Sequence, residues 1–194
     1  MSKSDPSAQK KERNKTIRWV VTIFIVTILV SGTISLISEE IMAASTMAVA
    51  FCILLAIVFI GIIFDIIGVA VTSADEKPFH SMAARKVPGA QDAIRLLRSA
   101  ERVSSICNDV VGDICGVVSG SASATITAQL MTNFEFSQPR IVGLIMSALV
   151  AALTVGGKAV GKTFAMNSCT AIVHTVGKIL FRLRQLRLPF VKKK

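Results

Sequence analysis

Residues 47–72 read MAVAFCILLAIVFIGIIFDIIGVAVT, a run in which Asp65 is the only charged residue. A helix rises about 1.5 Å per residue, so about 20 such residues cross a hydrocarbon core about 30 Å thick. This run is therefore long and apolar enough to be a transmembrane helix. The whole composition agrees, because 52% of the 194 residues are hydrophobic and the mean hydropathy is +0.63.

Further apolar stretches of suitable length occupy residues 17–38, 103–131 and 141–166. The first is longer than the ~7–15-residue apolar core of a cleavable signal peptide, so we interpret it as a retained anchor. Residues 103–131 are rich in small and polar side chains, and we expect this span to be the one most enclosed by protein. The sequence predicts an all-α integral membrane protein with about four transmembrane helices in one membrane domain over residues 17–170.

The segments outside these spans are polar and basic. Residues 1–16 form a basic tail, and residues 73–102 form a juxtamembrane segment that Pro88-Gly89 interrupts. After this break, residues 90–102 carry apolar side chains at helical spacing, which predicts an interfacial amphipathic helix. Residues 171–194 mix leucines with arginines, which indicates a basic amphipathic helix on the membrane surface, next to anionic lipid.

The basic residues predict an orientation. If Lys158 and Lys162 near the end of the fourth span are counted with the C-terminal region, all of the 22 Lys and Arg residues except Arg140 belong to the N-terminal region, the loop after the second span or the C-terminal region. Four spans place these three regions on one side, whereas Glu39, Glu40 and Glu135 lie on the other. The positive-inside rule then predicts a multi-pass protein of the cell (plasma) membrane with both termini in the cytoplasm.

No motif in the sequence indicates an enzyme. The four cysteines form no C-x-x-C pair, and the sequence lacks a phosphate-binding loop, a zinc-protease motif and a nucleophile elbow. We expect no enzymatic activity and no organic cofactor. The basic tails are expected to bind membrane lipid headgroups and no nucleic acid.

The third span contains the residues with the clearest chemistry. Asp109 and Asp113 lie one helical turn apart, next to Asn108 and one turn after Ser104 and Ser105. An acidic residue near the bilayer centre is unfavourable by roughly 2.5–3.5 kcal/mol, so such residues usually mark an ion pathway or a buried partner. Carboxylate, amide and hydroxyl oxygens suit a hard cation such as Mg²⁺.

Two alternatives for these acidic residues stay open. Asp109 and Asp113 could instead pair with Lys158 or Lys162 of the fourth span. Asp65, alone in the second span, could be a proton or cation site or an acid capped near a helix interruption.

Glycines recur every four residues on the same helix, at Gly112, Gly116 and Gly120. Small residues at this spacing allow two helices to approach closely. They predict either packing within the chain or association with a second copy, which we expect to be a homodimer.

The junctions between the spans resemble those of the cyclin M / CorB–CorC transmembrane domain. Residues 73–76 (SADE) are similar to its S-x-x-E signature, and residues 105–113 (SICNDVVGD) are similar to its asparagine-rich motif, with a shorter spacing. Residues 157–162 (GKAVGK) stand where that family has G-E-x-x-P-K, so Lys158 replaces a glutamate. We expect no counterpart of the family's cytoplasmic CBS pair.

This resemblance implies a three-span core with an extra first span, and transport of Mg²⁺ or Co²⁺. By position it implies that Ser73, Glu76 and Asn108 line the ion site. Together with the acids of the third span, the expected metal ligands are Ser73, Glu76, Asn108, Asp109 and Asp113. The predicted function is a divalent cation (Mg²⁺-like) transporter or transporter-like domain; the alternative is a non-transporting membrane scaffold or partner subunit.

Overall fold

The computed structural model describes the backbone of residues 6–133 and 139–191, and the side chains within them except at residues 6–16, 43, 139 and 187–191. These ranges are almost entirely helical and contain no strand, which confirms the all-α prediction. The helices are α1 (Pro6–Ala43), α2 (Met47–Ser73), α3 (Lys77–Ala84), α4 (Ala90–Arg98), α5 (Ala100–Ser105), the π-helical turn η1 (Ile106–Gly112), α6 (Asp113–Asn133), α7 (Pro139–Asn167) and α8 (Cys169–Val191).

Four helical segments are long and apolar enough to cross a membrane. They are Ile17–Met42, Met47–Ser73, Ala100–Asn133 and Arg140–Asn167, close to the predicted spans. The third is formed by α5, η1 and α6 in continuous succession. In its most apolar stretch 39% of residues are buried, against 22% in the second span, 6% in the fourth and none in the first. The prediction that the third span is the most enclosed is confirmed.

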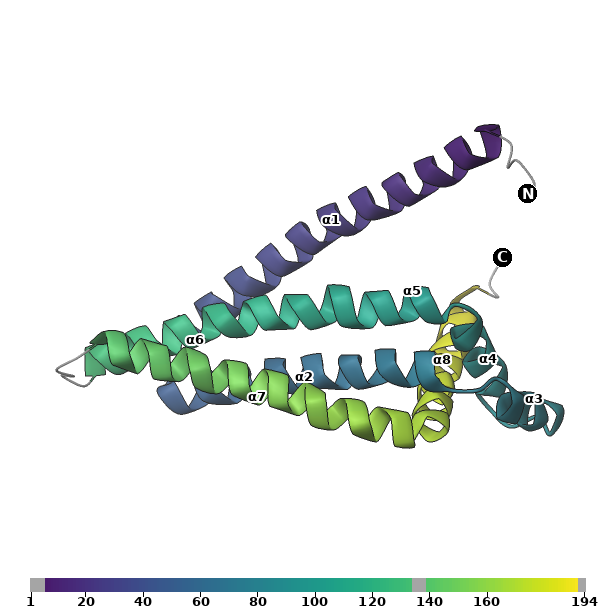
Figure 1. Cartoon of the computed structure of the whole chain (residues 1–194). Helices are drawn as coiled ribbons and strands as arrows, with labels where there is room; N and C mark the ends of the chain where they lie inside the picture. Colours follow the sequence, from purple (N-terminus) through teal and green to yellow (C-terminus); the bar gives the residue numbers. More distant parts are fainter. Residues whose placement is uncertain (1–5, 134–138, 192–194) are drawn as a thin grey trace.

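Three of these segments form the bundle (Figure 1). Helices α2 and α7 run parallel, and α5–η1–α6 runs antiparallel to both. One apolar cluster lies in the half of the bundle that contains the C-terminal end of α6, around Leu54, Val58 and Ile126. A second lies at the opposite end and joins α2 to α3, α4 and α8 through Val71, Phe79 and Val173.

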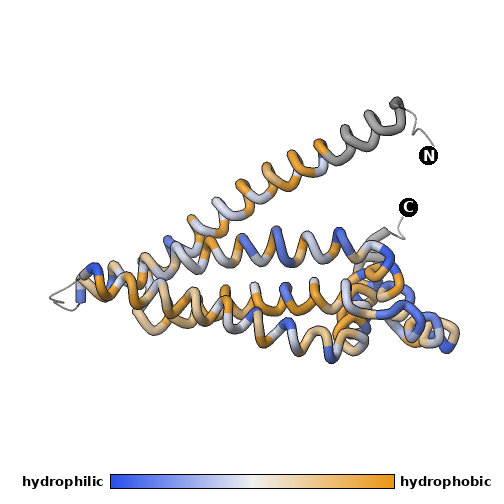
Figure 2. The backbone as a smooth tube through the Cα atoms, viewed as in Figure 1, coloured by the Kyte–Doolittle hydropathy of each residue, from blue (hydrophilic) through white to orange (hydrophobic). Residues whose placement is uncertain are grey.

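Helix α1 diverges from the bundle and packs only near its C-terminal end (Figure 1). There Met42 is fully buried, the side chain of Ser121 bonds to that of Glu39, and Gln129 Nε2 donates to the Met42 carbonyl at 2.8 Å. Because of these contacts the helix continues past residue 38, where the sequence predicts a loop. The turn to α2 is only Ala44–Thr46. Most of the coloured length of α1 is hydrophobic and is drawn in orange shades (Figure 2).

The other end of the bundle is covered by short helices. Gly89, at φ +84°, precedes the first residue of α4 at the predicted Pro88-Gly89 break. The amphipathic helix predicted over residues 90–102 ends earlier, at Arg98. Ser99 leaves helical geometry (φ −116°, ψ 29°), since α4 packs against α8 whereas α5 turns into the bundle. Helix α3 was not predicted, and α8 lies across the end of the bundle.

Candidate functional site

The third span is not a regular helix where its polar residues lie. Residues Ile106–Gly112 form a π-helical turn between α5 and α6. Such turns hold one residue more than a regular helix does and are frequent at functional sites. This turn contains Asn108 and Asp109 and ends at Gly112, directly before Asp113, so the irregular backbone coincides with the polar motif found in the sequence.

Asn108 points from this turn toward α2. Its amide contacts Gly68, where a side chain of any size would collide with it. The amide Nδ2 donates to Ser104 Oγ at 3.3 Å, while the buried Oδ1 receives no hydrogen bond from any described residue. A buried carbonyl oxygen without a donor is unfavourable by about 1–3 kcal/mol. An unsatisfied oxygen of this kind can accept a hydrogen bond or bind a cation.

An ion pair lies in the same region of the bundle. Lys158 of α7 has its Nζ 3.9 Å from Asp65 Oδ1 of α2, and both side chains are partly buried, at 28% and 17% exposed. The same Nζ lies beside Gly112, one turn after Asn108. Each charged residue lies about 12–14 Å along its helix from the nearer end, within one of the candidate spans. The opposite charges of Asp65 and Lys158 therefore compensate each other within the spans.

This pairing gives Asp65 a basic partner that neither interpretation from the sequence had named, and a role of Asp65 as a proton or cation site stays a prediction. Lys158 is paired with Asp65, and no ion pair with Asp109 or Asp113 is found among the described residues. Sequence reasoning missed the pair because it treated Asp65 as isolated. The glycines at α7 positions 157 and 161, which contact Ile62 and Ile66 of α2, were the available signal that these two helices approach closely.

The acids of the third span face outward. Asp109 and Asp113 are both exposed, and Ser105 Oγ donates to Asp109 Oδ2 at 2.8 Å. In the part of the chain that the structure describes, no three His, Cys, Asp or Glu side chains lie close enough together to hold a metal ion. Glu76, Asp109 and Asp113 thus do not form one acidic cluster, and the predicted ligand set stays a prediction.

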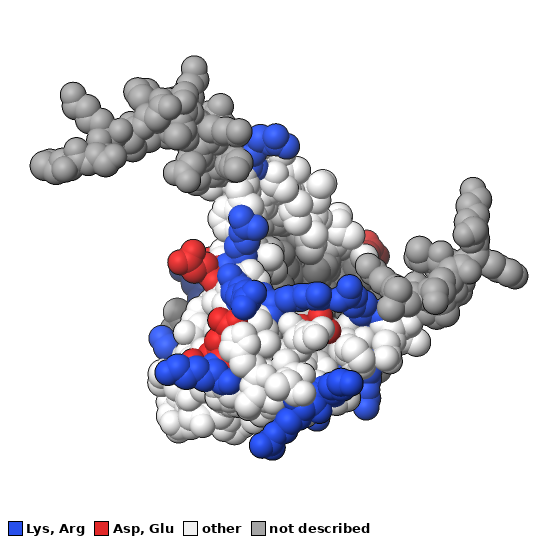
Figure 3. All heavy atoms as spheres, turned by 90° about the vertical axis from the view of Figure 1, so that its right-hand side faces the viewer, with Lys and Arg blue, Asp and Glu red and all other residues white. Residues whose placement is uncertain are grey.

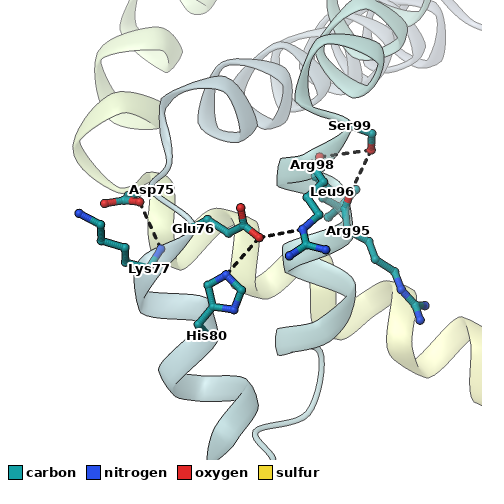
Figure 4. A network of polar contacts seen from close by, with 8 residues as sticks. All are labelled: Asp75, Glu76, Lys77, His80, Arg95, Leu96, Arg98 and Ser99. Atoms are coloured by element: carbon teal, nitrogen blue, oxygen red, sulfur yellow. Dashed lines mark hydrogen bonds and ion pairs between the residues drawn. The ribbon is translucent and has the colours of Figure 1, made fainter.

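The first junction lies at the end of the bundle. Ser73 is the exposed last residue of α2, and Glu76 precedes α3. Glu76 Oε1 accepts a hydrogen bond from Arg98 Nε at 2.9 Å and lies 3.2 Å from His80 Nε2 (Figure 4). In this arrangement Glu76 ties α3 to α4, and a cation would have to compete with Arg98 for the carboxylate.

A groove lined by small residues runs between α6 and α7. Its volume is about 490 Å³, and its walls carry Gly116, Gly120, Ser123, Gly143 and Ala151 among other small or hydroxyl side chains. A side chain added at Gly116 or Gly120 would meet nothing within 4 Å, whereas Gly112 faces Lys158. Of the predicted glycine stripe, Gly112 therefore packs inside the chain, whereas Gly116 and Gly120 lie on an open surface.

Comparisons of this chain with protein families, with curated proteins and with solved structures found no match.

Proposed function

We propose that the chain is a divalent-cation transporter or transporter-like membrane domain, with Mg²⁺ as the substrate its oxygen chemistry favours. The observation that carries this proposal is Asn108: a π-helical turn holds its amide inside the bundle, and its Oδ1 has no donor among the described residues. A cation carried across the membrane needs a site that replaces its water with protein oxygens. The resemblance to the cyclin M / CorB–CorC domain assigns the ion site to the same asparagine.

Lys158 is compatible with this role because Asp65 compensates its charge. In the resembled family a glutamate stands at this position, so the substitution by itself would repel a cation. With Asp65 Oδ1 3.9 Å from Lys158 Nζ, the local net charge is zero. A cation entering near Asn108 would then be attracted by Asp65 if Lys158 swings away, which makes the lysine a candidate gate.

The remaining predicted ligands fit the periphery of this site. Asp109 and Asp113 lie on the outer face of the same helix, and Ser73 and Glu76 lie at the end of the bundle. We propose that they attract and partly dehydrate the cation before it reaches Asn108. We also propose that the protein lies in the plasma membrane with both termini cytoplasmic, on the basis of its basic residues.

The test is Mg²⁺ uptake into liposomes that contain the purified chain and an enclosed Mg²⁺ indicator. Asn108→Ala should lower uptake to the rate of protein-free liposomes. The matched control is Asn133→Ala, an exposed asparagine at the far end of α6, which should transport like the unchanged chain. Unchanged uptake in Asn108→Ala would remove Asn108 from the site, and no uptake by the unchanged chain would remove transport itself.

The small-residue groove between α6 and α7 favours a second candidate, a scaffold that assembles as a homodimer. Open glycines and hydroxyls in a membrane-facing groove allow close contact with another helix. Gly116→Leu should then abolish dimers in detergent, measured by light scattering, while Gly32→Leu on α1, which is equally open, should not. Dimers that persist in Gly116→Leu would exclude this groove as the interface.

A further inference from the structure

Helix α8 has an apolar face that begins on the bundle and continues beyond it. Ile172 packs into the cluster around Val71 and Phe79 at the end of α2. Residues seven apart lie on one helix face, so Ile179 and Leu186 continue the face of Ile172. They are 52% and 68% exposed. Because the bundle is the membrane-embedded part, the continuation of this face lies at the membrane boundary.

Arginines flank this exposed apolar face. Arg182 and Arg184 of α8 are exposed, and Arg95 of α4 is exposed beside them. Figure 3 shows Lys and Arg side chains distributed over this end of the molecule, with fewer acidic groups among them. Apolar residues on a helix in the membrane plane, with cations at its border, are the arrangement that binds anionic lipid surfaces.

The two helices enclose a groove that combines both features. It has a volume of about 740 Å³, with Leu96 of α4 and the following Ser99 on one wall and Leu180 and Leu183 of α8 on the other. Its charged lining, called the border, consists of Arg95, Arg184 and the acidic Asp92. The apolar walls can hold an acyl chain, and the border presents positive charge.

Asp92 holds the two arginines of the groove in place. Its Oδ1 lies 3.1 Å from Arg95 Nη1 and 3.7 Å from Arg184 Nη1, and its side chain is only 13% exposed. One carboxylate balances one of the two positive charges, and each contact uses a single nitrogen. A guanidinium has five N–H donors, so both arginines keep donors for a phosphate.

We propose that the groove between α4 and α8 binds one anionic phospholipid, with its phosphate on Arg95 and Arg184 and an acyl chain along Leu180 and Leu183. The charge of the border selects the anionic headgroup, and continuity with the membrane boundary makes a lipid the occupant. The site anchors the end of the bundle to the cytoplasmic leaflet. It does not depend on the proposed cation transport.

The experiment measures lipid retained by the purified full chain. The chain is reconstituted in nanodiscs of phosphatidylcholine and phosphatidylglycerol at 3:1, released into detergent, and analysed by native mass spectrometry. The unchanged chain should retain one phosphatidylglycerol in preference to phosphatidylcholine. Arg95→Gln with Arg184→Gln should lower this retention about tenfold, as expected for losing charge-assisted hydrogen bonds.

Two further variants separate this site from general charge attraction. Arg85→Gln with Arg102→Gln removes the same charge from exposed positions outside the groove lining and should retain lipid within about twofold. Leu183→Ser with Leu186→Ser alters two exposed side chains, keeps the net charge and should also lose the lipid.

Three results of the retention measurements would overturn the proposal. They are equal retention of phosphatidylcholine and phosphatidylglycerol by the unchanged chain, equal loss in the two arginine variants, and unchanged retention in the leucine variant. Saturable binding of inorganic phosphate that prevents lipid retention would also overturn it, because the site would then belong to a free anion.

Discussion

Asp65 and Lys158 are the two residues whose charges depend on each other inside the membrane. Removing one partner of a buried pair leaves the other charge uncompensated, which lowers stability by about 3–5 kcal/mol. Removing both leaves no charge to stabilise. The pair is part-exposed, so the lower end of this range applies to it.

We therefore expect Lys158→Met to destabilise the chain and Lys158→Met with Asp65→Asn to recover most of that loss. Unfolding of the purified protein in detergent, followed by circular dichroism, gives the free energies of unfolding for a double-mutant cycle. The coupling should be about 1–3 kcal/mol. Lys162→Met, four residues further along α7 and exposed, is the control. Additive effects of the two substitutions would show that the ion pair contributes no energy.

Gly68 is the residue that admits the Asn108 amide. In Gly68→Ala the new methyl group would overlap the Asn108 amide, so this side chain must rotate away or the two helices must shift, at about 1–3 kcal/mol of stability. Gly116→Ala meets open space and should stay within about 1 kcal/mol of the unchanged chain, on the favourable side because alanine is the better helix former. Thermal unfolding in detergent compares them. Equal stability of the two variants would contradict the packing described for Asn108.

At the scale of elements, η1 sets the rotation of Asn108 relative to α6. A π-helical turn contains one residue more than a regular helix, so deleting one residue restores regular geometry. Because the wide turn takes up the extra residue, the helices on both sides then keep roughly their rotation, and the residues inside the turn change direction. Asn108 lies in the turn and would move relative to Gly68, while α5 and α6 could keep their packing on α2.

We expect deletion of Val110 to lower Mg²⁺ uptake in liposomes to that of Asn108→Ala, with the helical circular dichroism signal retained. Val110→Ala, which preserves the chain length, should keep uptake. Full uptake after the deletion would mean that the π-helical turn is not needed for function.

For the whole molecule, the arrangement of the helices allows two orientations in the membrane, which differ in the side on which the end with α8 lies. Helix α1 begins at the end of the molecule where α8 lies, and the loop between α6 and α7 is at the opposite end (Figure 1). Each end can therefore be assigned to one side of the membrane from one exposed residue.

In intact cells, and in a variant without the four native cysteines, Asn133→Cys should react with a membrane-impermeant maleimide, whereas Lys86→Cys should react only after lysis. Both positions are exposed at opposite ends of the molecule. The expectation follows from the basic residues at the Lys86 end. The reverse labelling pattern would place the termini outside.

Hydropathy predicted the four spans to within a few residues because the length and polarity of a segment are properties of that segment alone. The largest error concerned the end of the first span. There the helix continues through Glu39 to Ala43, since Met42 is buried and Glu39 bonds to Ser121 in a distant part of the sequence. The break in residues 90–102 was missed for the same reason, because it depends on α8.

The sequence by itself determined that this protein is helical, that four segments can cross a membrane, and that the third carries the polar residues. Only the tertiary structure decided that Lys158 lies against Asp65, that Asn108 faces Gly68, and that Asp109 and Asp113 face outward. Helical spacing relates residues within one helix. Contacts between helices depend on how each is rotated about its axis, and here one extra residue in η1 changes the direction of the residues inside that turn.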